Sequence, residues 1–290
     1  MIQISGVPFQ QSGMWPTGSI ESVIIQRMLA DPSIHSYHSI NELAFELKLR
    51  KNIIESAKAM NQGQAAFEVF ENSRANPQYW QITKTGGFLL KPGIKSSMAI
   101  HDIYNNSSQY AFECATAILI IYYHAVLNTI GEYLFNQLFQ NLYLYSWHSD
   151  SDLGLQTFDT NHFLPGDVVY FNNPDVDPEA SWWRGENAVV LGDGTYFGHG
   201  IGIETTEGMI QALNKTRKPG AIQSAYLLNS AIRPSFNQLG KLSMLPQGNR
   251  TYKIQHPVIH HNKCSISLLR YFHYLNKVYT QISSIHPFPK

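Results

Sequence analysis

The segment from Cys114 to Leu127 constrains the fold most, because it would be apolar on nearly every side of a helix. Its run from Ala115 is interrupted only by Thr116 and His124, and it is shorter than the ~20 residues that a membrane span needs. A helix that is apolar all round must be covered from every direction. A chain of 290 residues with 43% hydrophobic and 14% charged residues can supply that cover. We therefore expect a buried central helix in a folded, non-membrane protein.

The remaining sequence pattern predicts mainly helices before this segment and strands after it. Ser39 followed by Glu42 is a capping-box pattern, and apolar residues recur behind it at helical spacing, which predicts a helix over about 40–60. The Gly192–Gly194 stretch separates two apolar runs, as in a hairpin. The other predicted elements are helices at 20–29, 99–104, 132–145 and 206–214, two strands within 76–97, strands at 167–171, 187–191 and 195–203, and an apolar element at 221–228.

These elements indicate an α+β fold in which the buried helix packs on an antiparallel sheet, with extra helices at the N-terminus. We expect a catalytic domain over 1–235, with a largely helical part at about 1–105 and a core at about 106–235. Residues 236–290 lose clear periodicity and collect Asn, Gln, His and Pro. They are interpreted as a C-terminal extension of unknown role.

Charge and cysteine content exclude several classes of partner. Lys plus Arg and Asp plus Glu both number 21, so the net charge of zero gives no long-range attraction to nucleic acid or an anionic membrane. Two cysteines do not form a disulfide framework. The N-terminal sequence MIQISGVPFQ lacks the basic region and apolar run of a secretory signal. The sequence therefore predicts a protein of the reducing cytoplasm.

Cys114 lies in the first turn of the buried helix, where the helix dipole and unpaired backbone amides favour a thiolate. From this position alone, a small buried hydrophobic residue is the slightly better interpretation. Cys264 lies in the extension, and there the packing interpretation is strongly favoured.

A cysteine nucleophile needs a base within reach, and the predicted hairpin offers Glu186 and His199. If Asp193-Gly194 forms a two-residue turn, these two residues become diagonal neighbours on the same face of the hairpin. A three-residue turn would place them on opposite faces. Taken singly, His199 is more simply a half-buried histidine and Glu186 a surface carboxylate paired to Arg184. The helix-start cysteine gives both residues more weight as site members.

The order of these parts resembles the papain-like NlpC superfamily of bacterial cell-wall cysteine peptidases. A cysteine opens a buried helix, Pro165-Gly-Asp leads an apolar strand, and a hairpin carries polar residues. Those peptidases have His where this chain has Glu186. With that departure, the chain is similar over roughly 1–235 to the spore-coat protein-glutamine gamma-glutamyltransferases of endospore-forming bacteria. The stretches that carry this resemblance are HSINELAFELKLR (38–50), YAFECATAI (110–118), WRGEN (183–187), FGHG (197–200) and GAIQSAYLL (220–228).

The resemblance implies a papain-like, NlpC-type core and a calcium-independent acyltransferase that needs neither a cofactor nor a metal. Cys114 would be the nucleophile and Glu186 its principal partner. Glu113 would be a neighbouring carboxylate that substitutes in part, and His199 an orienting third member. The substrates would be proteins that supply glutamine and lysine side chains, expected to be spore coat proteins, in the mother-cell cytoplasm and then in the coat. The oligomeric state stays open.

Aromatic residues next to the expected base form a candidate substrate passage. Trp182 and Trp183 precede Glu186 closely and could supply an apolar wall that raises the pKa of its carboxyl, although ordinary aromatic core is an equal alternative. With Phe67, which the resemblance alone places here, they would exclude water and admit an extended lysine chain.

Two other functions remain as alternatives. A cell-wall peptidase or amidase of the same fold would need His in place of Glu186 as the base, and would usually need export. A coat scaffold without catalysis would leave Cys114 unreactive toward a glutamine-mimicking electrophile.

Overall fold

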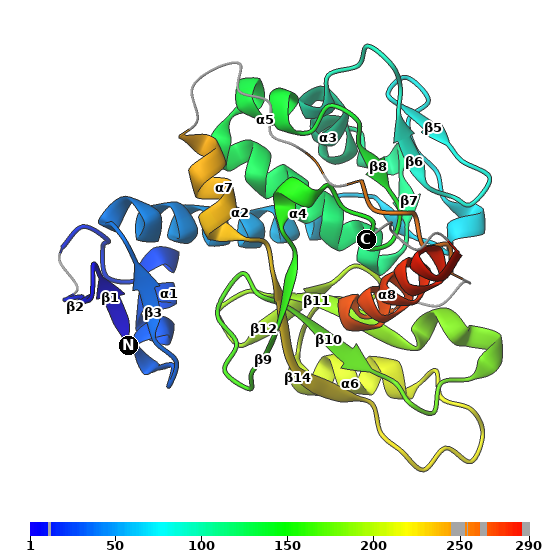
Figure 1. The fold of residues 1–290 in the computed structure, drawn as a ribbon. Helices are drawn as coiled ribbons and strands as arrows, with labels where there is room; N and C mark the ends of the chain where they lie inside the picture. The colour runs from blue at the N-terminus through cyan, green and yellow to red at the C-terminus, as the bar shows by residue number, and fades with distance from the viewer. Residues whose placement is uncertain (11–12, 245–252, 254, 262–265, 286–290) are drawn as a thin grey trace.

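The computed structural model describes residues 1–10, 13–244, 253, 255–261 and 266–285, with side chains up to Gln281. Its centre is helix α4 (Cys114–Ile130), which packs against the long helix α2 (Ile40–Gln62) and against a six-stranded sheet (Figure 1). Nearly every residue of α4 is buried, so the predicted interior helix is confirmed. Cys264 lies outside the described residues.

The sheet has the strand order β13-β12-β11-β10-β14-β9, and all neighbouring strands are antiparallel. Val168 and Val189 belong to the apolar cluster around α4, whereas Val169 and Ala188 face a second cluster with α6 (Thr206–Asn214). Strand alternation therefore separates two apolar layers, one on each face. The strands are β9 (Gln156–Asp159), β10 (Val168–Asn172), β11 (Gly185–Val190), β12 (Thr195–Gly198), β13 (Gly202–Thr205) and β14 (Tyr226–Arg233).

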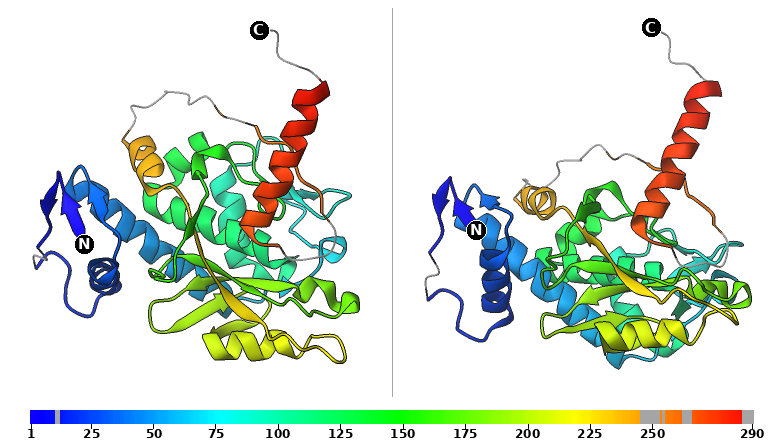
Figure 2. Two further views of the ribbon diagram at one scale, coloured as in Figure 1. Left: turned by 60° about the horizontal axis from the view of Figure 1, so that its bottom comes forward. Right: turned by 90° about the horizontal axis from the view of Figure 1, so that it is seen from below.

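Smaller elements surround this core. A small N-terminal sheet of order β2-β1-β3 packs with α1 around a separate apolar cluster, and α2 leads from it into the core (Figures 1 and 2). The elements are β1 (Ile2–Ile4), β2 (Val7–Pro8), α1 (Ile20–Ala30), β3 (His35–Tyr37), β4 (Ala66–Phe67), η1 (Phe70–Asn72), β5 (Trp80–Ile82), β6 (Phe88–Leu90), α3 (Ser96–Asn105), η2 (Ser107–Gln109), β7 (Ala111–Phe112), α5 (Glu132–Leu138), β8 (Tyr143–Leu144), η3 (Ser151–Leu153), η4 (Pro178–Trp183), α7 (Phe236–Ser243) and α8 (Leu268–Ile285).

Local hydrogen bonds explain why α2 begins and ends where it does. The Ser39 hydroxyl accepts the amide of Glu42, and the Glu42 carboxylate accepts the amide of His38 rather than that of Ser39. Gly63 follows the helix, and its amide closes on the carbonyls of Ala59 and Met60. The predicted helix over 40–60 is thus confirmed, with a variant of the expected capping box.

Several predicted boundaries were wrong. The predicted helix 132–145 ends at Leu138, since the chain returns as β8 to pair with β6. The predicted strand 195–203 is two strands, because the chain turns between Gly198 and Gly202. The apolar element at 221–228 becomes ordered strand only from Tyr226. The extension, which showed no clear periodicity, contains α7 and α8.

The hairpin register also differs from the two-residue turn predicted at Asp193-Gly194. The loop comprises Gly192, Asp193 and Gly194, with both glycines at positive φ, and Leu191 bonds to Thr195 across it. Ala188 therefore pairs with Gly198. The extra loop residue changes which side chains share a face.

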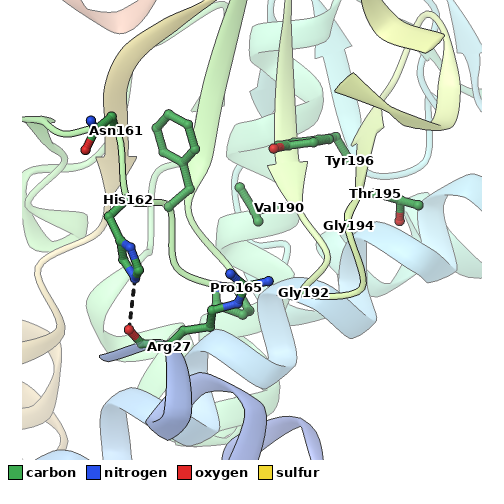
Figure 3. A pocket seen from close by; sticks show the side chains of 10 residues that line it. Arg27, Asn161, His162, Pro165, Val190, Gly192, Gly194, Thr195 and Tyr196 are labelled. Atoms are coloured by element: carbon green, nitrogen blue, oxygen red, sulfur yellow. Dashed lines mark hydrogen bonds between the residues drawn. The ribbon is translucent and has the colours of Figure 1, made fainter. Parts of the chain in front are cut away.

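A cavity of about 180 Å³ lies where the hairpin loop approaches α1 (Figure 3). His162 on the loop before β10 donates from Nε2 to the carbonyl of Arg27 in α1, at 2.9 Å. This contact connects the N-terminal part to the hairpin end of the sheet. Among the described helices, none is long and apolar enough to cross a bilayer.

An ionic network centred on fully buried Asp167 and Arg50 joins α2 to the sheet. Asp167 accepts from Arg50 at 2.8 Å and from Arg233 at 2.7 and 2.8 Å, so it links α2, the start of β10 and the end of β14. Gly166 precedes it at φ +83°, and a Cβ there would lie 3.0 Å from the Arg50 carbonyl. Burial raises the pKa of Asp167, but the two guanidinium charges outweigh burial and hold that pKa below its ordinary value.

Replacing Asp167 with Asn should leave the fully buried guanidinium of Arg50 and the partly buried one of Arg233 without their shared counter-charge. We expect the free energy of unfolding to fall by about 3–5 kcal/mol, measured by urea denaturation at pH 7. The control is Glu55→Gln, which removes an exposed partner of Lys51 and should cost less than about 1 kcal/mol. Equal small losses in both variants would contradict the structural role of the network.

Candidate active site

Cys114 is the first residue of α4 and is fully buried. Glu113 caps the helix: its carboxylate accepts the amides of Ala115 at 2.9 Å and Thr116 at 2.8 Å, together with the Thr116 hydroxyl. Burial raises the pKa of Glu113, while these hydrogen bonds and one with Cys114 act in the opposite direction. The sulfur thus lies at the positive end of the helix, beside a buried carboxyl group.

Glu186 lies near the start of β11 and is also buried. Its Oε1 accepts the amide of Gly200 at 3.3 Å, and its Cγ would lie 2.6 Å from a Cβ on Gly198. Only glycine leaves room for this carboxyl group. Burial, and next the charge of Glu113, raise the pKa of Glu186 to about 8, against hydrogen bonds from the amides of Gly200 and His199. That pKa is close to the ~8.5 of an ordinary thiol.

His199 does not share a face with Glu186 in the way expected from a two-residue turn, because β12 ends at Gly198 and the chain turns. Its Nε2 donates to the carbonyl of Ala66 at 3.1 Å, and its ring stacks on Phe112 with centroids 4.6 Å apart. Burial lowers the pKa of His199 to about 4, so the ring is neutral at pH 7. His199 therefore fastens the turn that supplies the amides to the Glu186 carboxyl.

Two of the three predicted aromatic residues form a pair. Phe67 and Trp183 stack with ring centroids 5.1 Å apart and an interplanar angle of 23°. Both rings lie against Gly200, where an added Cβ would come within 2.8 Å of Trp183 and 3.3 Å of Phe67. Because Gly200 also donates to Glu186, the pair lies beside the buried carboxyl group. Trp182 is half-buried next to Trp183 in η4.

The residue that hydrogen-bonds the sulfur is Asn187, which sequence reasoning did not select. Its Nδ2 donates to Cys114 Sγ at 3.2 Å, and both side chains are fully buried. Strand alternation explains this, since Asn187 shares a face with Val189, which packs in the cluster around α4. Tyr170 pairs with Asn187 on β10, and burial, followed by the charge of Cys114, raises the pKa of this tyrosine. An Asn within a buried apolar strand was the available sequence signal.

The C-terminal extension lies beside these residues. The Asn187 amide that contacts the sulfur also donates to the carbonyl of Ile266 at 3.2 Å. Ile266 lines a cavity of about 540 Å³ with Arg184 and Arg270. Within the described residues, no group of three or more His, Cys, Asp or Glu side chains could hold a metal ion.

Three comparisons with known proteins match this chain to the same family over most of its length. A family model described as protein-glutamine gamma-glutamyltransferase matches residues 1–243. A protein of that name from Halalkalibacterium halodurans is 53% identical to this chain over 275 residues, which cover 95% of this chain and 97% of that protein. Another from Bacillus subtilis is 44% identical over 235 residues, which cover 80% of this chain and 96% of that protein. A solved transglutaminase from Geobacillus stearothermophilus, without its C-terminal extension, is similar with a TM-score of 0.69 and 48% identity, covering 72% of this chain and all of that one.

The raised pKa of Glu186 predicts a pH dependence of stability. Between the unfolded pKa near 4.5 and the folded value of about 8, the folded protein keeps a proton that the unfolded chain loses. The contribution of this group is therefore fully present below 4.5 and is lost as pH rises, by up to about 1.4 kcal/mol per pH unit. Glu186→Gln should remove that slope, measured by urea denaturation from pH 4.5 to 8. The exposed Glu55→Gln should keep it, and parallel curves for wild type and Glu186→Gln would contradict the raised pKa.

Proposed function

The chain belongs to the protein-glutamine gamma-glutamyltransferase family, and from that premise we propose that Cys114 and Glu186 carry its reaction. The activity is an acyl transfer that joins a glutamine carboxamide of one protein to a lysine amine of another. The observation that carries the assignment of residues is a fully buried thiol at a helix N-terminus next to the carboxyl group of Glu113, whose charge in turn raises the pKa of buried Glu186.

In the first step, the Cys114 thiolate attacks the carboxamide carbon of a glutamine side chain. A C–S bond forms, the C–N bond breaks, and ammonia leaves with the proton that the thiol gave up. In the second step, a lysine amine attacks the thioester, the C–S bond breaks, and the amine proton returns to the sulfur. Two easier acyl exchanges thus replace one difficult exchange.

Glu186 is the proposed carrier of that proton. A carboxyl group at the ordinary pKa of ~4.3 would be a poor base for a thiol. The pKa of about 8 brings the Glu186 carboxyl close to the pKa of an ordinary thiol, so a proton can pass between them. Burial and the charge of Glu113 raise the pKa to this value. Glu113, which hydrogen-bonds with Cys114 while capping α4, is the proposed partial substitute. His199 orients the turn whose amides hold Glu186 and stays neutral.

Phe67 and Trp183 are the proposed walls of the lysine passage, with Trp182 at its outer side. Their stacking beside Gly200 keeps an apolar surface next to Glu186, which supports both exclusion of water and admission of an extended alkyl chain. The same surface would contribute to the desolvation that raises the pKa of the carboxyl group.

The wider assignments are proposals too. We assign 106–235 to a papain-like, NlpC-type core, 1–105 to its N-terminal part and 236–290 to the extension. A cysteine-led buried helix on an antiparallel sheet supports this division. We propose spore coat proteins as substrates, and the mother-cell cytoplasm and then the coat as the location, on the sequence resemblance and the Bacillus relative. We expect the reaction to need no calcium.

Incorporation of a fluorescent amine into casein tests the assignment of Cys114. Wild type should incorporate the amine equally with and without EDTA, and Cys114→Ala should abolish incorporation because no thioester can form. Cys264→Ala is the matched control and should keep wild-type activity. Glu186→Ala should reduce the rate by about 10²–10⁴-fold, the usual worth of a positioned proton carrier. No incorporation by wild type would defeat the enzymatic proposal, and full activity of Cys114→Ala would defeat the residue assignment.

Trp183→Ala should shift the pH dependence of acylation toward lower pH. Removing this ring lets water reach Glu186 and lowers the pKa of its carboxyl from about 8. The single-turnover rate of ammonia release, measured from pH 5 to 9, gives the midpoint. Trp182→Ala is the matched control and should leave the midpoint in place. An unchanged midpoint in Trp183→Ala would remove this role from the ring.

A further inference from the structure

Two buried side-chain N–H groups converge on one carbonyl oxygen beside the sulfur. Trp147 Nε1 donates to the carbonyl of Ile266 at 2.8 Å, and Asn187 Nδ2 donates to the same oxygen at 3.2 Å. The Asn187 nitrogen also lies 3.2 Å from Cys114 Sγ. Trp147 and Asn187 are 1% and 0% exposed. A site that binds a carbonyl oxygen therefore adjoins the proposed nucleophile.

We propose that Trp147 and Asn187 are the donors that bind the glutamine carboxamide oxygen during acyl transfer, and that the Ile266 carbonyl occupies their site as a built-in competitor. This inference rests on the proposed role of Cys114. The donors lie inside the region that the family model matches, whereas Ile266 lies beyond its end at residue 243. The reaction common to the family therefore does not depend on Ile266, and without it the two donors are available to a substrate carbonyl oxygen.

The chemistry requires such a site. When the sulfur of Cys114 bonds to the carboxamide carbon, the π electron pair of the C=O bond moves to the oxygen. Preorganised N–H donors stabilise that charge in a water-excluded site and disperse it until the C–N bond breaks. The nitrogen then takes the proton held by Glu186 and departs as ammonia, and the C=O bond of the thioester re-forms.

The loop that carries Trp147 is held in a strained shape. Ser146 has φ +48°, a region that non-glycine residues rarely adopt. Its amide donates to Thr116 Oγ1 at 2.9 Å, and that hydroxyl donates to Glu113 at 3.0 Å. One chain of buried hydrogen bonds thus runs from the cap of α4 to the Trp147 loop. Strain that is fixed by surrounding bonds is a feature of functional sites.

The extension is anchored on both sides of Ile266. His261 bonds to Ser146 Oγ at 2.7 Å, and Lys253 forms ion pairs with Asp150 and Asp152. The first turns of α8 lie against the body and its far end points away (Figure 2). The described apolar residues of the extension that are buried in the main core are Leu239, Leu242, Ile259, Ile266, Leu268, Tyr271 and Leu275. These contacts hold the Ile266 carbonyl in place on the donors beside Cys114, which is 0% exposed.

Displacing the extension should expose the thiol. In the full-length chain with Cys264→Ala, Leu268→Asp places a charge at a position that is 0% exposed and should loosen the start of α8. We expect iodoacetamide to alkylate Cys114 about tenfold faster in this variant, because the open form becomes a larger fraction of the protein. Leu269→Asp, at a neighbouring position that is 57% exposed, is the matched control and should react at the parent rate. Near-ultraviolet circular dichroism shows whether the Leu268→Asp protein is folded. If it is folded and still reacts at the parent rate, the proposed role of Ile266 as a competitor is overturned.

A second pair of variants tests the donors themselves, and decides the case if Leu268→Asp does not fold. Trp147→Phe and Asn187→Leu each remove one donor, and each should lower kcat for amine incorporation by about 100-fold or more. Alkylation by iodoacetamide passes through no oxyanion, so its rate should not fall in Trp147→Phe, which leaves the hydrogen bond from Asn187 to the sulfur in place. Trp15→Phe, in the separate N-terminal cluster, controls for loss of an indole and should keep wild-type kcat. A wild-type kcat in either donor variant, or a parallel fall of kcat and alkylation in Trp147→Phe, would overturn the inference.

These outcomes separate the two proposals. Absence of amine incorporation by wild type would defeat the proposed function. Alkylation of Cys114 needs no turnover, so it would still show whether the extension shields the thiol. Active wild type with insensitive donor variants would defeat the further inference alone.

Discussion

The complete burial of α4 is the constraint on which the rest of the structure depends. A helix that is apolar on every side needs cover from α2, from one sheet face and from the strands near its ends. The first turn of the helix brings polar backbone amides into that apolar interior. Two of these amides have no partner within the helix and donate to the Glu113 carboxylate. A thiol at this point is shielded from solvent and close to the positive end of the helix dipole. The position of the proposed chemistry thus follows from how the helix must be packed.

The pKa values of buried carboxyl groups in this protein are shifted in different directions, according to the charges beside them. Asp167 is held below its ordinary pKa by Arg50 and Arg233, and it serves as a rigid joint between α2 and the sheet. Glu113 and Glu186 are equally buried, yet desolvation dominates and their pKa values rise. Glu113 and Glu186 also repel each other, so ionisation of one opposes that of the other. The position of the cations therefore separates Asp167, whose pKa is lowered, from Glu113 and Glu186, the two proposed proton carriers.

The parts that sequence predicted well are those set by local pattern. The apolar run after Cys114 and the cap at Ser39 predict α4 and α2 because their signals lie within a few turns. The hairpin register failed because glycine stands on both sides of Asp193, so loops of two and three residues look alike. That single residue makes Ala188 pair with Gly198, so His199 is not the diagonal neighbour of Glu186 that a two-residue turn would give. The buried face of α8 could have been found from the spacing of Leu268, Tyr271 and Leu275, but the bond from Trp147 to Ile266 joins residues far apart in sequence, which no local pattern reveals.

Because Ile266 is part of the same chain as the site it fills, its local concentration does not fall when the enzyme is diluted. A tethered group of this kind acts at millimolar effective concentration when its linker fits the span. Dilute glutamines would then compete poorly, whereas glutamines packed together on an assembling surface would displace the tether. Such an enzyme would respond to the density of its substrates rather than to their total amount, and would join proteins mainly after they have gathered.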